Sequence, residues 1–281
     1  MAAHTASSAS TSTLRALPLA ALTLQDEASF AHVGLYADLK ARLLADDYHV
    51  TVLPERAQRW DHALLLNLSF WDASGGGDVL VDEGLPADVL CHMAWHHLAA
   101  GALGPPGQPL SAPAMLLGES IASAFDLYLV GRLLGHAPDS DFLHSQLPAM
   151  ADAAANAGVD ADAFAAMLDD VRADPEAAFE ALRRLIFDVS LALLSAENAD
   201  QALAALLRFE DAPYACLLHH FELSSWLQHA RAAPDNDSST RAHALDQALR
   251  LAPVALDWLA DHWELSPPTA PWVAAPRPNS R

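Results

Sequence analysis

ADVLCHMAWHHLAAG at positions 87–101 and MLLGESIASAFDLYLV at positions 115–130 decide the fold of this chain. Both segments are rich in Ala and Leu, and the breaker-rich run GALGPPGQPLSAP lies between them, so they predict two consecutive helices. Residues four apart in a helix share one face, which puts Asp88, His92 and His96 in one stripe with His97 beside it. Two imidazoles at this spacing can reach one metal ion.

The second helix adds acidic groups to this arrangement. Glu119 and Asp126 lie seven residues apart, so they fall on one side of the helix and can supply one ligand and a second carboxylate behind it. Two His and one carboxylate leave open coordination positions, as catalytic zinc and non-heme iron sites require. We therefore expect one divalent metal ion, zinc or iron, bound by His92, His96 and Glu119. Asp88 and Asp126 are expected to orient the imidazoles.

Other interpretations of the same residues stay open. Histidines four apart also occur in helices that bury them as hydrogen-bonded side chains, here beside Trp95. His97 is a further ligand candidate. A second cluster, at His219, His220 and Glu222, would supply more ligands if a late helix at 212–233 packs over the first site, and a dinuclear centre would then form. Otherwise these late histidines are a hydrogen-bonded pair on a helix.

Composition predicts the fold class. The chain has 281 residues, of which 52% are hydrophobic, so it can bury a sizeable core. Ala and Leu dominate and β-branched residues are sparse, which favours helices. We expect an α+β fold that is mainly α, with a short N-terminal sheet followed by a helical bundle.

The same patterns divide the chain into regions. A Ser/Thr-rich start without a cationic segment predicts a loose arm over 1–24 that ends in a short docking segment, rather than a signal peptide. Residues 25–265 are expected to form one mainly helical domain, with its sheet at about 46–82 and its helical part at 86–265. The Pro-rich segment 266–281 is expected to be a tail.

Within that domain, β-rich or alternating runs predict strands at 48–54, 62–71 and 79–81. Helical spacing and breakers predict further helices at 25–45, 139–157, 160–172, 175–196, 198–209, 212–233 and 240–263.

Charge and cysteine content exclude several functions. The formal net charge is -21, from 15 Lys+Arg against 36 Asp+Glu, so phosphate backbones and anionic lipid surfaces would be repelled. We expect neither nucleic acid nor membrane as a partner, and a small-molecule or peptide substrate instead. Cys91 and Cys216 are the only cysteines and form no CxxC pair, which favours a reducing, cytoplasmic location.

The segment LLGESIASAFDLYL resembles the third-ligand helix of gluzincin metallopeptidases, especially the aminopeptidase form xNEGFASYFE. In that superfamily an HExxH helix supplies two zinc-bound histidines and the next helix supplies a glutamate. The resemblance implies a zincin-like core in which His92 and His96 take the HExxH positions and Glu119 takes the third. It covers positions 87–130, and the matching residues of the second helix are Glu119, Ile121, Ala122, Ser123, Phe125 and Asp126.

The chain departs from this superfamily at the general base. HExxH reads HMAWH here, so Met93 stands where the superfamily has the glutamate that takes a proton from the attacking water. Proton transfer of this kind is worth about 10²–10⁴-fold in rate. We therefore expect no ordinary peptidase activity, and a glutamate at position 93 would be expected to restore some.

Two functional hypotheses follow from that loss. One is a metal-dependent enzyme, with zinc or non-heme iron, that acts on a peptide or small molecule. The other is a zincin-like pseudoenzyme that binds a protein partner.

Overall fold

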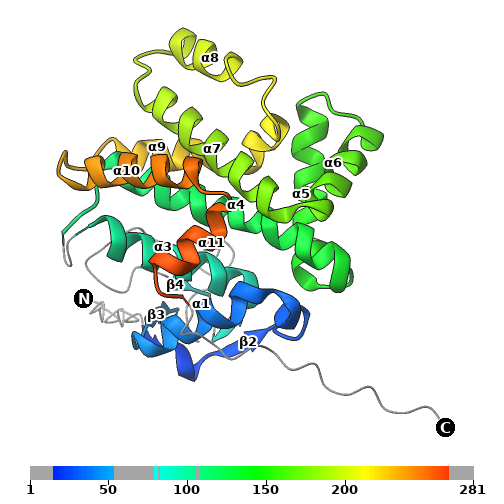
Figure 1. Cartoon of the computed structure of the whole chain (residues 1–281), viewed down its shortest axis with the longest axis vertical. Helices are drawn as coiled ribbons and strands as arrows, with labels where there is room; N and C mark the ends of the chain where they lie inside the picture. The colour runs from blue at the N-terminus through cyan, green and yellow to red at the C-terminus, as the bar shows by residue number, and fades with distance from the viewer. Residues whose placement is uncertain (1–14, 54–78, 82, 105–107, 266–281) are drawn as a thin grey trace, which may run out of the picture.

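The fold is a small N-terminal sheet region followed by a bundle of helices (Figure 1), as the composition predicted. This computed structural model describes residues 15–53, 79–81, 83–104 and 108–265. The long helices are α3 (Ala87–Leu103), α4 (Ala112–His136), α5 (Asp141–Asn156), α6 (Ala161–Ala173) and α7 (Pro175–Leu194). The shorter ones are α1 (Gly34–Ala45), α8 (Ala199–Leu207), α9 (Leu223–Ala230), α10 (Ser238–Leu251) and α11 (Ala255–His262).

The strands form two small sheets. In the first, the order is β1 (Arg15–Pro18), β3 (His49–Val52) and β4 (Val79–Leu80), with β1 antiparallel and β4 parallel to β3. The second pairs β2 (Thr23–Gln25) with β5 (Gly84–Pro86) in parallel.

Two of the three predicted strands are confirmed at the predicted positions. The strands predicted at 48–54 and 79–81 appear as β3 and β4. The strand predicted at 62–71 lies outside the described residues. The structure adds β1 and β2 in a segment expected to belong to the arm, and β5 just before α3.

The helices predicted between 139 and 209 are confirmed as α5, α6, α7 and α8. Local capping explains all four starts, because Ser140, Asp160, Asp174 and Asn198 each accept a hydrogen bond from the backbone N–H three residues later. These bonds satisfy donors that the first helical turn leaves free. Pro175 follows Asp174 as the first residue of α7, where its missing N–H costs nothing.

Three predicted helices are interrupted. The helix expected over 25–45 becomes a 3-10 turn, η2 (Ser29–His32), followed by α1. The helix expected over 240–263 divides into α10 and α11, because Pro253 cannot donate a backbone hydrogen bond. The prediction of one continuous helix over 212–233 was wrong. This segment contains a 3-10 helix, η3 (Ala215–His220), then extended backbone at Phe221, and then α9. One further 3-10 turn, η1 (Leu19–Ala21), joins β1 to β2.

Helix α4 is the centre of the bundle. It contacts α3, α5, α6, α7, α9 and α10, with α7 as its most extensive neighbour. Its length and hydropathy would also suit a membrane span, but 94% of the relevant window is buried inside the protein. A helix that is apolar on all sides and enclosed by other helices is typical of a core element.

One glycine of α4 allows this close packing. A Cβ on Gly131 would lie 2.6 Å from the carbonyl oxygen of Val171 and 3.0 Å from Cγ of Pro175. A Cβ on Gly135, four residues later on the same helix, would meet nothing within 4 Å. Gly131 therefore lies in a crowded helix contact, whereas Gly135 on the same helix has space for a methyl group.

We expect Gly131→Ala to lower the free energy of unfolding, because the overpacking cost of about 1–3 kcal/mol exceeds the helix-propensity gain of about 1 kcal/mol. Gly135→Ala should gain up to about 1 kcal/mol, since it pays no steric cost. Urea denaturation of both variants measures the difference. Equal shifts in the same direction would contradict the packing explanation.

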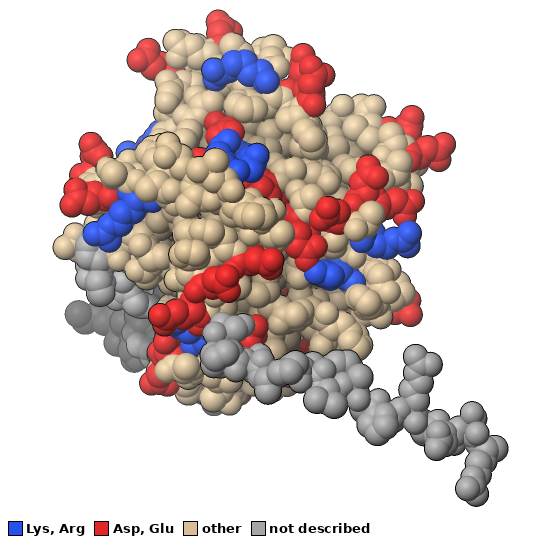
Figure 2. Space-filling view, in the orientation of Figure 1, with Lys and Arg blue, Asp and Glu red and all other residues tan. Residues whose placement is uncertain are grey.

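The surface agrees with the acidic composition. Figure 2 shows Asp and Glu side chains spread widely over the visible face, with Lys and Arg in smaller, separate groups. Such a field favours cations and repels anionic polymers.

Candidate metal centre

Helices α3 and α4 approach each other closely beside the predicted ligands. A Cβ on Gly118 would lie 3.4 Å from Cβ of Ala99 and 4.0 Å from Nδ1 of His96. Both distances are ordinary van der Waals contacts, so they show that α3 and α4 are neighbours one residue before Glu119.

The three predicted ligands converge on one point. Nε2 of His96 lies 3.1 Å from Nε2 of His92 and 3.3 Å from Oε1 of Glu119. One ligand atom from each of the three residues lies within 4.8 Å of the others, and in the described part of the chain this is the group of His, Cys, Asp or Glu that meets that condition. The helix periodicity and the Pro/Gly break therefore placed the two segments correctly.

These separations match those of ligands around one ion. With metal–ligand bonds of about 2.0–2.1 Å, two atoms at a tetrahedral angle lie about 3.3 Å apart. The two contacts of His96 are at this spacing. A divalent ion can thus be shared by these atoms after a small approach of His92 and Glu119 toward each other.

The cluster is buried on its inner side and open on its outer side. The side chains of Glu119 and His96 are 4% and 11% exposed, whereas those of His92 and Asp126 are both 23% exposed. Burial lowers the pKa of His96 well below its usual range, and the neighbouring His92 lowers it further. A neutral imidazole is the form that binds metal. An additional ligand would reach the cluster from the side of His92 and Asp126.

Asp126 occupies the orienting position that the sequence suggested. Its Oδ2 lies 3.5 Å from Nδ1 of His92, the ring nitrogen that does not face His96. A carboxylate at this place holds the ring so that Nε2 points into the cluster.

Asp88 lies one turn before His92 on the same helix. Burial raises the pKa of its carboxyl group to about 6, the negative charge of Asp126 adds to this, and His92 opposes it. Asp88 also accepts backbone hydrogen bonds from the first turn of α3. It therefore combines helix capping with a place near the open side of the cluster.

The other proposed ligands lie elsewhere. Nε2 of His97 is 2.7 Å from Oδ2 of Asp46, and its ring packs edge-on against Tyr48, so it faces α1 and β3. His220 is hydrogen-bonded through Nε2 to Oε1 of Gln146 at 3.1 Å. Its half-buried position lowers its pKa, while the charge of Asp126 raises it.

The residues of the late cluster are not part of the group of ligand atoms that gathers at His92, His96 and Glu119. His219 and Glu222 are exposed, and the break at Phe221 removes the helical i, i+3 relation on which their pairing depended. His220 is linked to the site only through its electrostatic interaction with Asp126. Within the described residues, the ligand atoms that gather are those of His92, His96 and Glu119.

No protein-family profile, curated protein or solved structure matches this chain. The likeness to gluzincins therefore rests on the residues of α3 and α4 alone.

The likeness to gluzincins placed Met93 where those enzymes have their general-base glutamate, but the structure places this side chain in the core. The side chain of Met93 is fully buried and is part of the hydrophobic core. Trp95, two residues later, is also fully buried and packs against Phe125 and Trp263 with ring centroids 5.3 and 5.9 Å away. Met93 and Trp95 therefore flank the stripe of α3 that carries the two histidines, and both belong to the apolar interior.

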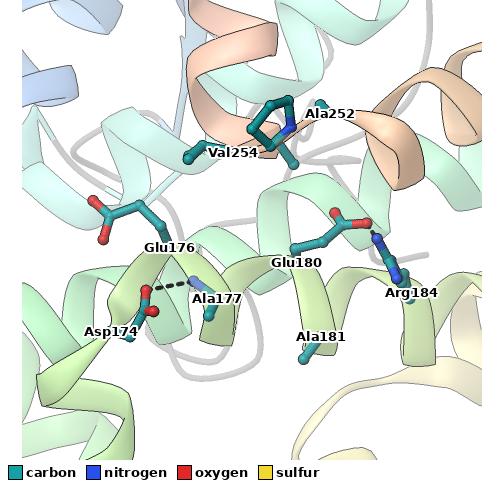
Figure 3. A pocket seen from close by; sticks show the side chains of 10 residues that line it. Asp174, Glu176, Ala177, Glu180, Ala181, Arg184, Ala252 and Val254 are labelled. Atoms are coloured by element: carbon teal, nitrogen blue, oxygen red, sulfur yellow. Dashed lines mark hydrogen bonds and ion pairs between the residues drawn. The ribbon is translucent and has the colours of Figure 1, made fainter.

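A separate pocket of about 330 Å³ lies between the start of α7 and the start of α11 (Figure 3). Its acidic groups already have partners. Asp174 caps α7, Glu176 pairs with Arg132, and Glu180 pairs with Arg183 and Arg184. These side chains stabilise helix ends and helix contacts, so we assign the pocket no chemistry.

Proposed function

We propose that this protein is a metalloprotein that binds one divalent ion, zinc or iron, through His92, His96 and Glu119. The observation that supports this proposal is the convergence of three metal-ligating side chains from two helices at ligand-to-ligand spacing. Glu119 is buried in the middle of an apolar helix, where a carboxylate is costly unless it is well paired. A cation shared with two imidazoles would offset that cost.

We further propose that the ion serves a reaction other than glutamate-assisted peptide hydrolysis. Three protein ligands leave coordination positions free, and the exposed side of the cluster, at His92 and Asp126, is where a small molecule or peptide would approach. The bound ion would supply Lewis-acid chemistry, or redox chemistry in the case of iron. The role of the chain is to hold the ligands, with Asp126 orienting His92.

The alternative is a protein that uses the same scaffold to bind a partner without catalysis. The burial of Met93 agrees with either hypothesis, because both lack the hydrolytic glutamate. The metal content of the native protein separates them.

Protein purified without added metal should contain about one zinc or iron per chain. We expect His96→Ala and Glu119→Gln to reduce the bound metal to well below one per chain, because each removes a ligand. Elemental analysis measures the content. His97→Ala is the matched control, since it removes the neighbouring imidazole that is engaged with Asp46.

Stability gives a second measurement of the same proposal. A ligand that binds only the folded state at 100 times its dissociation constant stabilises that state by about 2.7 kcal/mol. Metal should therefore raise the melting temperature of the wild-type protein and of His97→Ala, but not that of His96→Ala. Metal-free wild-type protein that gains no stability from zinc or iron would contradict metal binding and leave the partner hypothesis.

A further inference from the structure

Solvent reaches the central helix at one point beside the candidate metal centre. Over residues 114–131 of α4, each residue is buried except Asp126, whose side chain is 23% exposed. Its Oδ2 lies 3.5 Å from Nδ1 of His92, a side chain that is equally exposed. A molecule that enters from solvent and reaches the metal ligands therefore passes the Asp126 carboxylate.

A second carboxylate lies on the same side of the cluster. Asp88 precedes His92 by one turn of α3 and is partly exposed. Its pKa is raised by burial and then by the negative charge of Asp126, so the two carboxylates are within electrostatic reach of each other. The opposing influence comes from His92 and backbone N–H groups, not from Lys or Arg. Two interacting carboxylates of this kind attract a cation.

The other histidine on this side does not supply that positive charge. His220, in η3, interacts electrostatically with Asp126. Burial nevertheless lowers its pKa, so the imidazole is neutral at neutral pH, and its Nε2 is hydrogen-bonded to Oε1 of Gln146 at 3.1 Å. The negative charge of the two carboxylates thus remains available to a ligand.

The ligand atoms of His92, His96 and Glu119 independently indicate a bound ion next to this pair, because they lie within 4.8 Å of one another. A divalent ion held by two neutral imidazoles and one carboxylate keeps one positive charge. Asp88 and Asp126 add two negative charges, so the loaded site carries one net negative charge. A ligand with one positive charge cancels it, whereas an anionic ligand would be repelled.

We infer that the metal ion and the Asp88–Asp126 pair together bind a small molecule that carries an ammonium group. A neutral or anionic donor atom of this molecule occupies a free position on the ion, and its ammonium group lies between the two carboxylates. Residues four apart on a helix have Cβ atoms about 5–6 Å apart, which sets the approximate distance between the donor atom and the ammonium group. This inference rests on the proposed metal centre.

The test uses the full-length, metal-loaded protein and three hydroxamates, which bind zinc and iron. They share a chain of roughly four methylene groups, chosen to match that distance, and differ in its end group: ammonium, methyl or carboxylate. Calorimetric titration measures their dissociation constants. The ammonium probe should bind about tenfold tighter than the methyl probe, because charge-assisted hydrogen bonds are the stronger ones. The carboxylate probe should bind more weakly than both.

Asp88→Asn should reduce the preference for the ammonium probe to about threefold or less and keep about one ion per chain. Asparagine retains the shape and the backbone hydrogen bonds of Asp88 but not its charge. Asp162→Asn is the matched control, since it removes an exposed carboxylate of α6 and the same net charge. This control should keep the full preference.

The outcomes separate this inference from the metal site on which it rests. A metal-loaded protein that binds the ammonium and methyl probes equally would overturn the inference and leave the metal site in place. An unchanged preference in Asp88→Asn, or an equal loss in Asp162→Asn, would also overturn it. Loss of the ion in Asp88→Asn would assign Asp88 to the metal rather than to the ligand. Wild-type protein that holds no ion would contradict the proposed function, and the inference with it.

Discussion

Replacing Met93 with glutamate is expected to destabilise the fold strongly and to produce no peptidase activity. Met93 is fully buried in the hydrophobic core, next along α3 from His92. A carboxylate at that place would lose its hydration inside the hydrophobic core. The cost of burying such a group is several kcal/mol, whether it stays ionised or takes up a proton.

Urea or thermal denaturation of Met93→Glu measures this cost. Met93→Leu is the matched control, because a volume-conserving apolar exchange should cost less than about 1.5 kcal/mol. If Met93→Glu instead folded with wild-type stability and cleaved peptides when loaded with zinc, position 93 would face the metal and the orientation of α3 described above would be wrong.

This expectation replaces the one that the sequence alone suggested. Matching HMAWH to HExxH placed Met93 at the position of the general base. The motif identifies candidate ligands, but it does not show which way the side chain at position 93 points. In the structure, Met93 and Trp95 lie on either side of the stripe that carries the two histidines, and both are buried. The residues that resemble gluzincins and also gather in the structure are thus His92, His96 and Glu119, whereas position 93 lies in the core.

The ligand positions themselves were predictable. His92 and His96 are one helical turn apart, and Glu119 and Asp126 are the acidic residues of the otherwise mostly apolar α4. A carboxylate in an apolar helix needs a partner, and the nearest polar face in the sequence belongs to α3. Local periodicity and the cost of buried charge were sufficient to bring these side chains together.

Pairings between distant segments were not predictable in the same way. β1 pairs with β3 across more than thirty residues, from Arg15 opposite Val52 to Pro18 opposite His49, and no local pattern marks that partner. The break at Phe221 also lacks a signal, since no Gly or Pro lies between Tyr214 and α9. Tertiary packing determined both features, and it removed His219 and Glu222 from the proposed site.

The buried ion pairs between α7 and α10 lead to the second large prediction. Arg183 is fully buried and donates to both carboxylate oxygens of Glu180, at 2.6 and 2.8 Å, and to Oδ1 of Asp246 at 2.8 Å. The network continues from Asp246 to Arg250 and from Arg250 to Asp188. It joins two helices that both pack on α4, the helix that carries Glu119.

Arg183→Ala should lower the free energy of unfolding by about 3–5 kcal/mol, because it leaves buried carboxylates without their central cation. The lower end of that range is expected, since Glu180 keeps Arg184 and Asp246 keeps Arg250 as partners. Arg184→Ala is the matched control. Its side chain is 40% exposed, and an exposed pair is worth about 1 kcal/mol or less.

Comparison of the two arginine variants by urea denaturation tests whether burial, rather than the number of ion pairs, decides their effect. Both arginines contact Glu180, so a similar loss of stability in the two variants would contradict the argument. A third variant, Arg183→Met with Glu180→Gln and Asp246→Asn, removes the charges together and should recover part of the stability lost in Arg183→Ala. Recovery would show that unpaired buried charge, and not the lost side-chain volume, causes most of the destabilisation.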